Sequence, residues 1–222
     1  MIKNNINKLR RIPVLPVLIL ILNSCIGLSL DIQMNRDGSG RVIMEYRISN
    51  LLNSIGALDG NESTAIIPVS RNDWERSIEN ISGVKFVSFS NRENASGSVI
   101  NAVFDFSDPQ SLALLLDSTG KSASITQTGQ NNSLNIILHD EPSSGYDANL
   151  LTLMRSFFSD YNVSLSFGAQ TNSTLTVTDG KGNAGKTPSQ AAIIQSGRRV
   201  SFSIGIMDLL ELPDGLGVKI NW

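Results

Sequence analysis

The sequence predicts an α+β domain in which a mainly antiparallel β-sheet, built from hairpins, is covered on one face by two or three helices. Most apolar runs alternate with polar residues at a period of two, which is typical of strands with one buried and one solvated face. Turns containing glycine or asparagine separate successive runs and favour hairpins. A few further segments carry apolar residues at helical spacing. The chain has 222 residues, enough for one substantial core.

The first predicted hairpin spans residues 28–48. Apolar residues occupy alternate positions in 28–34 and again in 42–48, with polar residues between them. The sequence Asp-Gly-Ser-Gly at 37–40 separates the two runs, and glycine reaches positive φ without steric cost. Residues 49–69 contain glycine and many polar residues and are expected to form an extended loop.

The middle of the chain predicts a helix, a hairpin, a second helix and a further hairpin. Ser70 is a suitable N-cap for the first helix, and Gly83 is suited to end it. Pro109 and Gly120 play the corresponding roles for the second helix. The expected bounds, in order, are Ser70–Ile81, Val84–Ser90 with Ser98–Phe106, Gln110–Asp117, and Ser122–Thr128 with Ser133–His139.

A longer helix is predicted over Asp147–Tyr161. Its apolar stripe is formed by Leu150, Leu153, Met154, Phe157, Phe158 and Tyr161. The stripe either packs on the sheet or faces lipid or a partner protein. Four more strands complete the domain, at Val163–Phe167, Thr174–Thr178, Arg199–Ile206 and Val218–Trp222.

The N-terminal segment has the pattern of a secretory signal. Residues 1–11 are basic and polar, and residues 12–22 are apolar throughout, with two prolines. A membrane-spanning helix needs about 20 apolar residues, so this run is too short for one. We therefore expect residues 1–24 to be a signal peptide.

The end of this segment, Leu22-Asn23-Ser24-Cys25, resembles the lipobox of bacterial lipoproteins. Asn23 departs from the usual small or β-branched residue and is similar to the relaxed lipoboxes of spirochaete lipoproteins. The resemblance implies cleavage between Ser24 and Cys25 and lipidation of Cys25. Residues 25–222 would then be a single envelope domain tethered to a bacterial membrane. The alternative is a buried cysteine that follows an apolar segment. Because Cys25 is the only cysteine, no internal disulfide can form.

The charge balance argues against nucleic acid as a partner. The first 24 residues hold four basic residues and no acidic one, so residues 25–222 carry 14 basic and 20 acidic residues, a net charge of −6. Nucleic-acid binding needs a basic surface that neutralises phosphates. We expect no nucleic-acid partner.

Residues 180–187 match the phosphate-binding P-loop pattern GxxxxGK[ST] through Gly180, Gly185, Lys186 and Thr187. A P-loop needs a long helix that starts at the Gly-Lys pair. Pro188 follows directly, and the helical stretch available, Ser189–Ile194, is short. The preceding strand is amphipathic, and only 35 residues remain after Thr187. We interpret the match as incidental and expect no cofactor.

Other sites for chemistry are incomplete. His139 is the only histidine, so neither a histidine-paired triad nor a two-histidine zinc site can be built; we expect it on the polar side or edge of a strand. Asp179, Lys181 and Asn183 imitate the start of a calcium loop, but its twelfth position is Gln190 instead of a carboxylate. We expect no metal and no enzymatic activity, with a distant carboxylate pair left open.

The mature chain also resembles the LppM-type domain of bacterial lipoproteins. The likeness rests on the early Asp-Gly-Ser-Gly turn at 37–40, the strand end 103–106 (Val-Phe-Asp-Phe), and the closing stretch 197–204 that leads to Ile220-Asn221-Trp222. It implies an α+β envelope domain with no established catalytic residues, and makes lipid contact a natural expectation.

Three functions follow as hypotheses. The first is a non-enzymatic envelope lipoprotein, held to the membrane through Cys25, that binds a protein partner or an envelope phospholipid. The second is a lipid carrier with an internal apolar cavity. The third is an exported hydrolase with separated carboxylates.

Overall fold

The computed structural model describes residues 26–49, 68, 70–94, 97–129, 131–140, 151–152, 154–155 and 158–222. The predicted signal peptide, Cys25 and most of the loop expected over 49–69 lie outside these residues. Within the described ranges, no helix is both long enough and apolar enough to cross a membrane. Cleavage after Ser24 and lipidation of Cys25 therefore stay predictions.

The part of the chain that the structure describes contains eleven strands and three helices with defined bounds. The strands are β1 (Ile26–Met34), β2 (Gly40–Ser49), β3 (Val84–Asn94), β4 (Gly97–Phe106), β5 (Ala123–Thr128), β6 (Asn131–His139), β7 (Asn162–Gly168), β8 (Thr174–Thr178), β9 (Ala192–Ser196), β10 (Arg199–Gly205) and β11 (Leu216–Asn221). The helices are α3 (Arg71–Ile78), between β2 and β3, α4 (Pro109–Leu116), between β4 and β5, and α6 (Ile206–Leu210), between β10 and β11.

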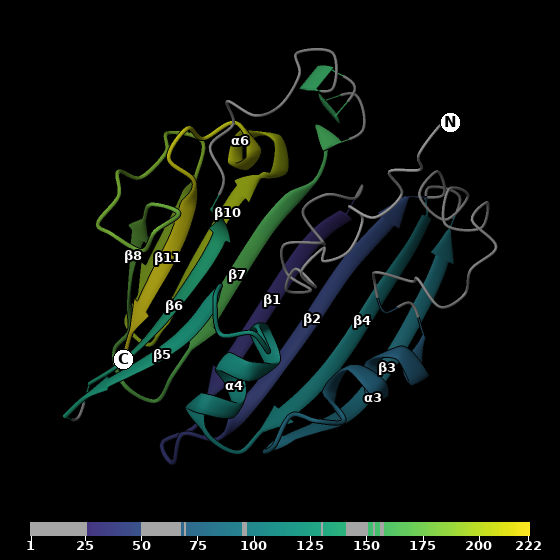
Figure 1. Cartoon of the computed structure of the whole chain (residues 1–222), viewed down its shortest axis with the longest axis vertical. Coiled ribbons are helices and arrows are strands. Elements are labelled where there is room, and N and C mark those ends of the chain that lie inside the picture. The colour runs from purple at the N-terminus through teal and green to yellow at the C-terminus, as the bar shows by residue number, and fades with distance from the viewer. Residues whose placement is uncertain are drawn as a thin grey trace, which may run out of the picture.

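These strands form two sheets (Figure 1). A seven-stranded sheet has the order β3-β4-β2-β1-β7-β10-β9, and a four-stranded sheet has the order β5-β6-β11-β8. The pairings are antiparallel except that β1 runs parallel to β7. The predicted α+β class is confirmed, and the division into two sheets adds to it.

The core lies on the inner face of the seven-stranded sheet. Every second residue of β1, β2, β4, β7 and β10 is buried, as the alternation predicts, and fully burying one such side chain contributes about 1.5–3 kcal/mol. Figure 1 shows the four-stranded sheet, α3 and α4 in front of this face. Trp74 of α3 packs edge-on against Phe104 of β4, with ring centroids 5.2 Å apart. The other face of the large sheet carries mainly polar side chains, with a few half-buried apolar ones such as Ile43 and Val103.

The hairpin of β1 and β2 is confirmed together with its turn. Gly38 has a φ of 86°, which favours glycine. The Asp37 carboxylate accepts hydrogen bonds from the backbone N–H and the hydroxyl of Ser39, at 3.0 and 2.7 Å. These bonds hold the pKa of Asp37 below its usual value. The register that this turn sets places Leu28 opposite Tyr46.

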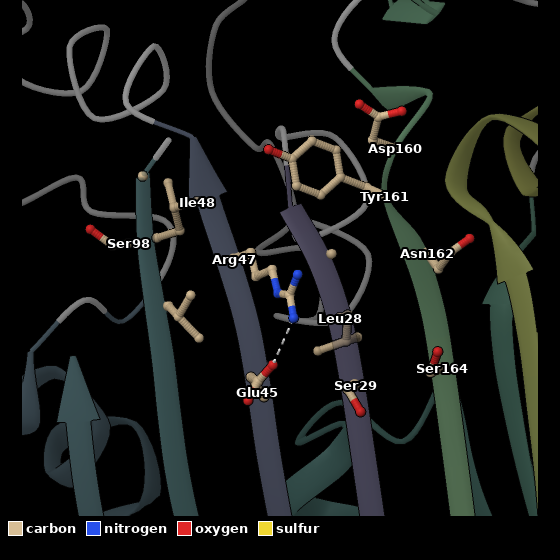
Figure 2. Close-up of a pocket in the computed structure, with 13 residues that line it drawn as sticks. Leu28, Ser29, Glu45, Arg47, Ile48, Ser98, Asp160, Tyr161, Asn162 and Ser164 are labelled. Carbon is tan, nitrogen blue, oxygen red and sulfur yellow. Dashed lines mark ion pairs between the residues drawn. The ribbon is translucent and has the colours of Figure 1, made fainter. Parts of the chain in front are cut away.

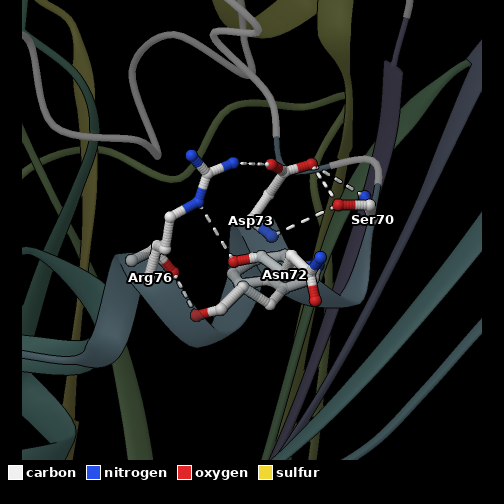
Figure 3. Close-up of polar contacts among 6 residues, drawn as sticks. Ser70, Asn72, Asp73 and Arg76 are labelled. Carbon is white, nitrogen blue, oxygen red and sulfur yellow. Dashed lines mark hydrogen bonds and ion pairs between the residues drawn. The ribbon is translucent and has the colours of Figure 1, made fainter. Parts of the chain in front are cut away.

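Helix α3 begins with the cap predicted at Ser70 (Figure 3). The Ser70 hydroxyl oxygen accepts the Asp73 N–H at 3.2 Å, and the Asp73 carboxylate accepts the Ser70 N–H at 3.0 Å, which completes a capping box. The helix ends at Ile78 instead of Ile81. The Ile81 N–H donates to the Ile78 carbonyl at 2.9 Å, so a tighter turn replaces the last helical turn.

One sequence prediction is wrong in the C-terminal part. Residues 189–194 do not form a helix: Ala192–Ser196 is strand β9, which pairs with β10 across a turn in which Gly197 has a φ of 56°. β-branched Ile193 and Ile194 suit a strand once β10 supplies hydrogen-bond partners. The strand predicted over Arg199–Ile206 is confirmed to within one residue: β10 stops at Gly205, and Ile206 begins the short helix α6.

His139 also differs from its prediction. It is 6% exposed at the end of β6, which lies between β5 and β11 inside the smaller sheet. The expected polar or edge position is therefore wrong, because the backbone at Gly180 and Gly215 packs closely against the end of β6.

The predicted helix over Asp147–Tyr161 is described in part. The structure describes a helix at residues 151–152, 154–155 and 158. Residues 147–150, 153 and 156–157 lie outside the described ranges. Met154 and Phe158 are buried, so this portion of the apolar stripe packs in the core.

Candidate binding site beside the first strand

Two arginines on the outer face of the large sheet have carboxylate partners on other strands of the same sheet. Arg41 of β2 lies opposite Asp105 of β4 and donates two hydrogen bonds to it, at 2.7 and 3.1 Å. These contacts hold the pKa of the Asp105 carboxyl below its usual value. Arg199 of β10 donates to Asp31 at 2.8 Å and to the Ser166 hydroxyl at 3.0 Å.

Arg47 is placed differently on the same face. Its neighbours directly across the sheet are Gly27 of β1 and Val99 of β4, neither of which carries a charge. Its ion pair is with Glu45, two residues away on its own strand, at 3.6 Å. The Arg47 side chain is 65% exposed, so this long contact leaves much of its guanidinium at the surface.

A hollow of about 400 Å³ lies beside Arg47, and we call it the β1 pocket (Figure 2). It occupies the end of the sheet where β1, β4 and β7 begin and β2 ends. Figure 2 shows Arg47 extending from β2 toward β1, and the Tyr161 ring above the start of β1. Glu45, Ser29, Ser164 and Asp160 also line the hollow.

Glycine at position 27 helps to open this hollow. Gly27 lies within β1, and its backbone does not need glycine, since its φ is not positive. A Cβ atom here would lie 3.3 Å from Cδ1 of Tyr161. The missing side chain therefore lets the Tyr161 ring lie close against the start of β1, where both residues line the hollow.

The rest of the pocket floor is a row of small polar side chains. Ser29 lies between Glu45 of β2 and Ser164 of β7 in the ladder register. The hydroxyls of Ser164 and Ser203 are 3.1 Å apart and share a hydrogen bond. The pocket thus combines one guanidinium, two carboxylates, hydroxyls and an aromatic ring at one strand end.

The segment that matches the P-loop pattern has a packing explanation for its glycines. A Cβ at Gly180 would lie 2.7 Å from the His139 carbonyl oxygen, and one at Gly185 would lie 2.7 Å from the Thr178 carbonyl carbon. Thr178 and Ala184 form a β-bridge that closes the loop. After Lys186 the chain reaches β9 without an intervening helix, whereas a phosphate-binding loop needs a helix start there.

The Asp179 carboxylate occupies the centre of this loop. It accepts the backbone N–H groups of Lys181 and Asn183 at 2.9 and 2.8 Å, and the Asn183 side-chain amide at 3.0 Å. These hydrogen bonds, the Asn183 side chain first, lower the pKa of Asp179. Backbone N–H groups that could cradle an anion thus already bind a carboxylate of the same loop. Gln190 lies in a separate turn.

No metal centre is found among the residues that the structure describes, because no group of three potential histidine, cysteine, aspartate or glutamate ligands converges there. Of the predicted functional residues, Ser24 and Cys25 lie outside the described ranges. The sequence analysis missed Gly27, Arg47 and Tyr161. The register of the first hairpin could have paired Gly27 with Arg47, but no local signal brings Tyr161 to them.

A solved structure shows a distant likeness to this chain. No protein-family model matches the chain, and no curated protein matches it. Among solved structures it is similar to the NMR structure of the folded domain of the LppM protein of Mycobacterium tuberculosis, with 12% identity, a TM-score of 0.41, and coverage of 89% of each chain. At this identity and TM-score, the likeness transfers no residue and no activity to this chain.

Proposed function

We propose that this chain is a non-enzymatic envelope lipoprotein, anchored to a bacterial membrane through lipidated Cys25, whose domain binds a protein partner or an envelope lipid. The observation that carries the proposal is the order of residues at the start of the domain. Cys25 directly precedes Ile26, the first residue of β1. Consecutive Cα atoms are about 3.8 Å apart, so no linker separates the proposed anchor from the sheet.

This short connection gives the domain a defined position in the proposal. The strand end beside the lipid-bearing residue would face the membrane surface, and the β1 pocket lies at that end. A tether raises the local concentration of anything on the membrane, so a weak interaction is sufficient. Stable anchoring takes two acyl chains, or one chain and a second signal, and the diacylglyceryl group implied by the lipobox meets this need.

A lipid carrier is the second candidate, and the size of the apolar space bears on it. The hollow between α3 and α4, lined by apolar residues such as Trp74, Ile78 and Leu115, measures about 50 Å³. Pockets that enclose a small-molecule ligand start at about 300 Å³. This hollow would have to enlarge several-fold before it could enclose an acyl chain.

A hydrolase with separated carboxylates is the third candidate. Such an enzyme needs one carboxyl group that stays protonated near neutral pH. Hydrogen bonds lower the pKa of Asp179, which keeps this carboxyl ionised. At Asp117 burial acts to raise the pKa, but the hydrogen bonds that the carboxylate accepts lower it by more. These carboxylates suit structural roles, which supports the non-enzymatic proposal.

The proposal is tested by the fate of the N-terminus. The full chain and its Cys25→Ala variant are expressed in a lipoprotein-processing bacterium with labelled fatty acid, and intact masses are measured. We expect the wild type to lose residues 1–24 and to carry label, and the variant to do neither. An unlabelled wild type with its original N-terminus would overturn lipid anchoring.

A further inference from the structure

The β1 pocket holds opposite charges side by side. Glu45 and Arg47 are two residues apart on β2 and project from the same face of the sheet. Their charged groups form an ion pair in which Nη2 of Arg47 lies 3.6 Å from Oε1 of Glu45, and both side chains are partly exposed. Exposed ion pairs of this kind contribute little free energy, so a ligand that carries both charges can replace each partner of the pair with one of its own ends.

We propose that the β1 pocket binds a small zwitterionic group, in which an anion and a primary ammonium are joined by a short carbon link. The anion lies against the Arg47 guanidinium, and the ammonium lies against the Glu45 carboxylate. The planar guanidinium can donate two parallel hydrogen bonds to a phosphate or carboxylate. The pocket volume of about 400 Å³ is within the range of small-ligand sites.

The charges of the pocket select against simpler ligands. A lone anion would be attracted by Arg47 but repelled by the Glu45 and Asp160 carboxylates that also line the hollow. A lone ammonium would be attracted by these carboxylates but repelled by Arg47, and it would leave the guanidinium without an anion. A zwitterion satisfies both signs, and the Ser29 and Ser164 hydroxyls on the floor can hydrogen-bond to either end.

Two sources supply this chemistry. One is the headgroup of a phospholipid that ends in a primary amine, and the other is a soluble amino acid or peptide. Only the lipid source rests on the proposed function, since it requires the pocket to lie at a membrane. The ligand chemistry itself does not depend on Cys25.

The first experiment uses the full chain with Cys25→Ala, purified in detergent, so that its outcome is independent of lipidation. Glycerophosphoethanolamine, glycerol phosphate, ethanolamine and glycylglycine are titrated separately by calorimetry. We expect a zwitterion to bind at least about fivefold more tightly than either single-charge probe. Preference for glycerol phosphate or ethanolamine, or binding by none of the four, would overturn the proposal.

Variants locate the binding site. Arg47→Gln removes the guanidinium and is expected to weaken zwitterion binding about five- to tenfold, as loss of charge-assisted hydrogen bonds predicts. Arg41→Gln is the matched control, because Arg41 lies on the same face of β2 but pairs with Asp105 outside the pocket. Equal weakening by both substitutions would show that the response reflects overall charge and would refute the site.

A filled pocket gives an independent test. Gly27→Ser places a side chain at the wall of the pocket, where φ is not positive but the new Cβ would lie 3.3 Å from Cδ1 of Tyr161, so the ring has to shift slightly. We expect a thermal midpoint that falls by a few degrees, as mild overpacking predicts, and at least a fivefold loss of affinity. Unchanged affinity would argue that the ligand binds elsewhere.

A second experiment separates the two sources. The lipidated wild type is reconstituted in vesicles of phosphatidylethanolamine or of phosphatidylcholine, whose methylated ammonium offers no N–H group to Glu45. If the lipid is the ligand, added glycerophosphoethanolamine should bind only in phosphatidylcholine vesicles. Equal binding in both assigns the site to a soluble zwitterion. Failure of lipidation alone would appear in the acyl-labelling experiment and would leave the titrations unaffected.

Discussion

Gly185 offers a direct test of why the P-loop-like segment contains its glycines. A Cβ at this position would lie 2.7 Å from the carbonyl carbon of Thr178 and 2.8 Å from the backbone nitrogen of Asp179. Both atoms belong to the backbone, so no side-chain rotation can relieve the contact. The Gly185 N–H also donates to the Val177 carbonyl at 3.2 Å. In Gly185→Ala the loop must move away from the end of β8.

The expected magnitude follows from these contacts. Overpacking typically costs about 1–3 kcal/mol, and a lost backbone hydrogen bond adds about 1 kcal/mol. The free energy of unfolding should therefore fall by about 2–4 kcal/mol. For a chain of this size, 1 kcal/mol corresponds to about 2–4 °C in the thermal midpoint, so we expect a decrease of about 4–16 °C. Lys186→Ala changes an exposed side chain and should stay within about 0.5 kcal/mol.

The assay is thermal unfolding of the full chain and both variants, with and without Mg-ATP. The packing explanation predicts a lower midpoint for Gly185→Ala, an unchanged midpoint for Lys186→Ala, and no effect of nucleotide on any of the three proteins. A P-loop would give a different pattern. Stabilisation of the wild type by Mg-ATP that disappears in Lys186→Ala, with little intrinsic effect of Gly185→Ala, would refute the packing argument.

Three further predictions concern stability. Asp117 is 2% exposed and accepts the Thr119 hydroxyl and the Ser122 N–H, so Asp117→Ala should lower the free energy of unfolding by about 3–5 kcal/mol in urea denaturation, and a loss below 1 kcal/mol would contradict the buried network. Burial alone would raise the pKa of Asp117, but the hydrogen bonds that its carboxylate accepts outweigh this effect and hold the pKa below 3.8. The stabilisation that the Asp117 carboxylate gives to the folded state should therefore be complete above pH 3.8 and be lost as the pH falls through the pKa of the folded state. Urea denaturation at several pH values should show a smaller acid dependence for Asp117→Asn than for the wild type. The Gln195 side-chain amide accepts the Leu175 N–H at 3.3 Å and donates to the Leu175 carbonyl at 3.2 Å, and so joins β9 to the edge strand β8. Gln195→Ala should lower the free energy of unfolding by about 1–3 kcal/mol and speed hydrogen exchange at the Leu175 amide. Unchanged exchange at Leu175 would refute this role.

The elements that the sequence predicted correctly depend on local information. The hairpin of β1 and β2 follows from alternation on both sides of a turn whose Gly38 has positive φ. The start of α3 follows from a cap, because Ser70 and Asp73 are close in sequence and need no distant partner. In each case one short segment contains both the hydrogen-bond donor and its acceptor.

The errors occur where distant partners decide the outcome. Residues 192–196 can form a strand because β10 offers hydrogen bonds across the Gly197 turn, and the short apolar run alone does not distinguish a strand from a helix. His139 is buried where the backbone at Gly180 and Gly215, far along the chain, packs against the end of β6, although alternation within β6 suggested a polar position. The parallel pairing of β1 with β7 likewise depends on chain segments far apart.

The β1 pocket depends both on local pairing and on contacts between distant parts of the chain. The sequence could therefore have indicated at most its hairpin residues, and these were not among the predicted sites. Gly27 and Arg47 face each other through the register of the first hairpin, whereas Tyr161 arrives with β7, after most of the chain has intervened. An arginine without an opposing carboxylate carries little energetic cost on an exposed face, so exposure of Arg47 alone would indicate nothing. Its significance comes from what lies beside it. A Cβ at position 27 would lie 3.3 Å from Cδ1 of Tyr161, so glycine lets the Tyr161 ring lie close against the start of β1, and both residues line the hollow together with Arg47. This contact requires the tertiary fold, because no pattern within the first hairpin brings Tyr161 to Gly27.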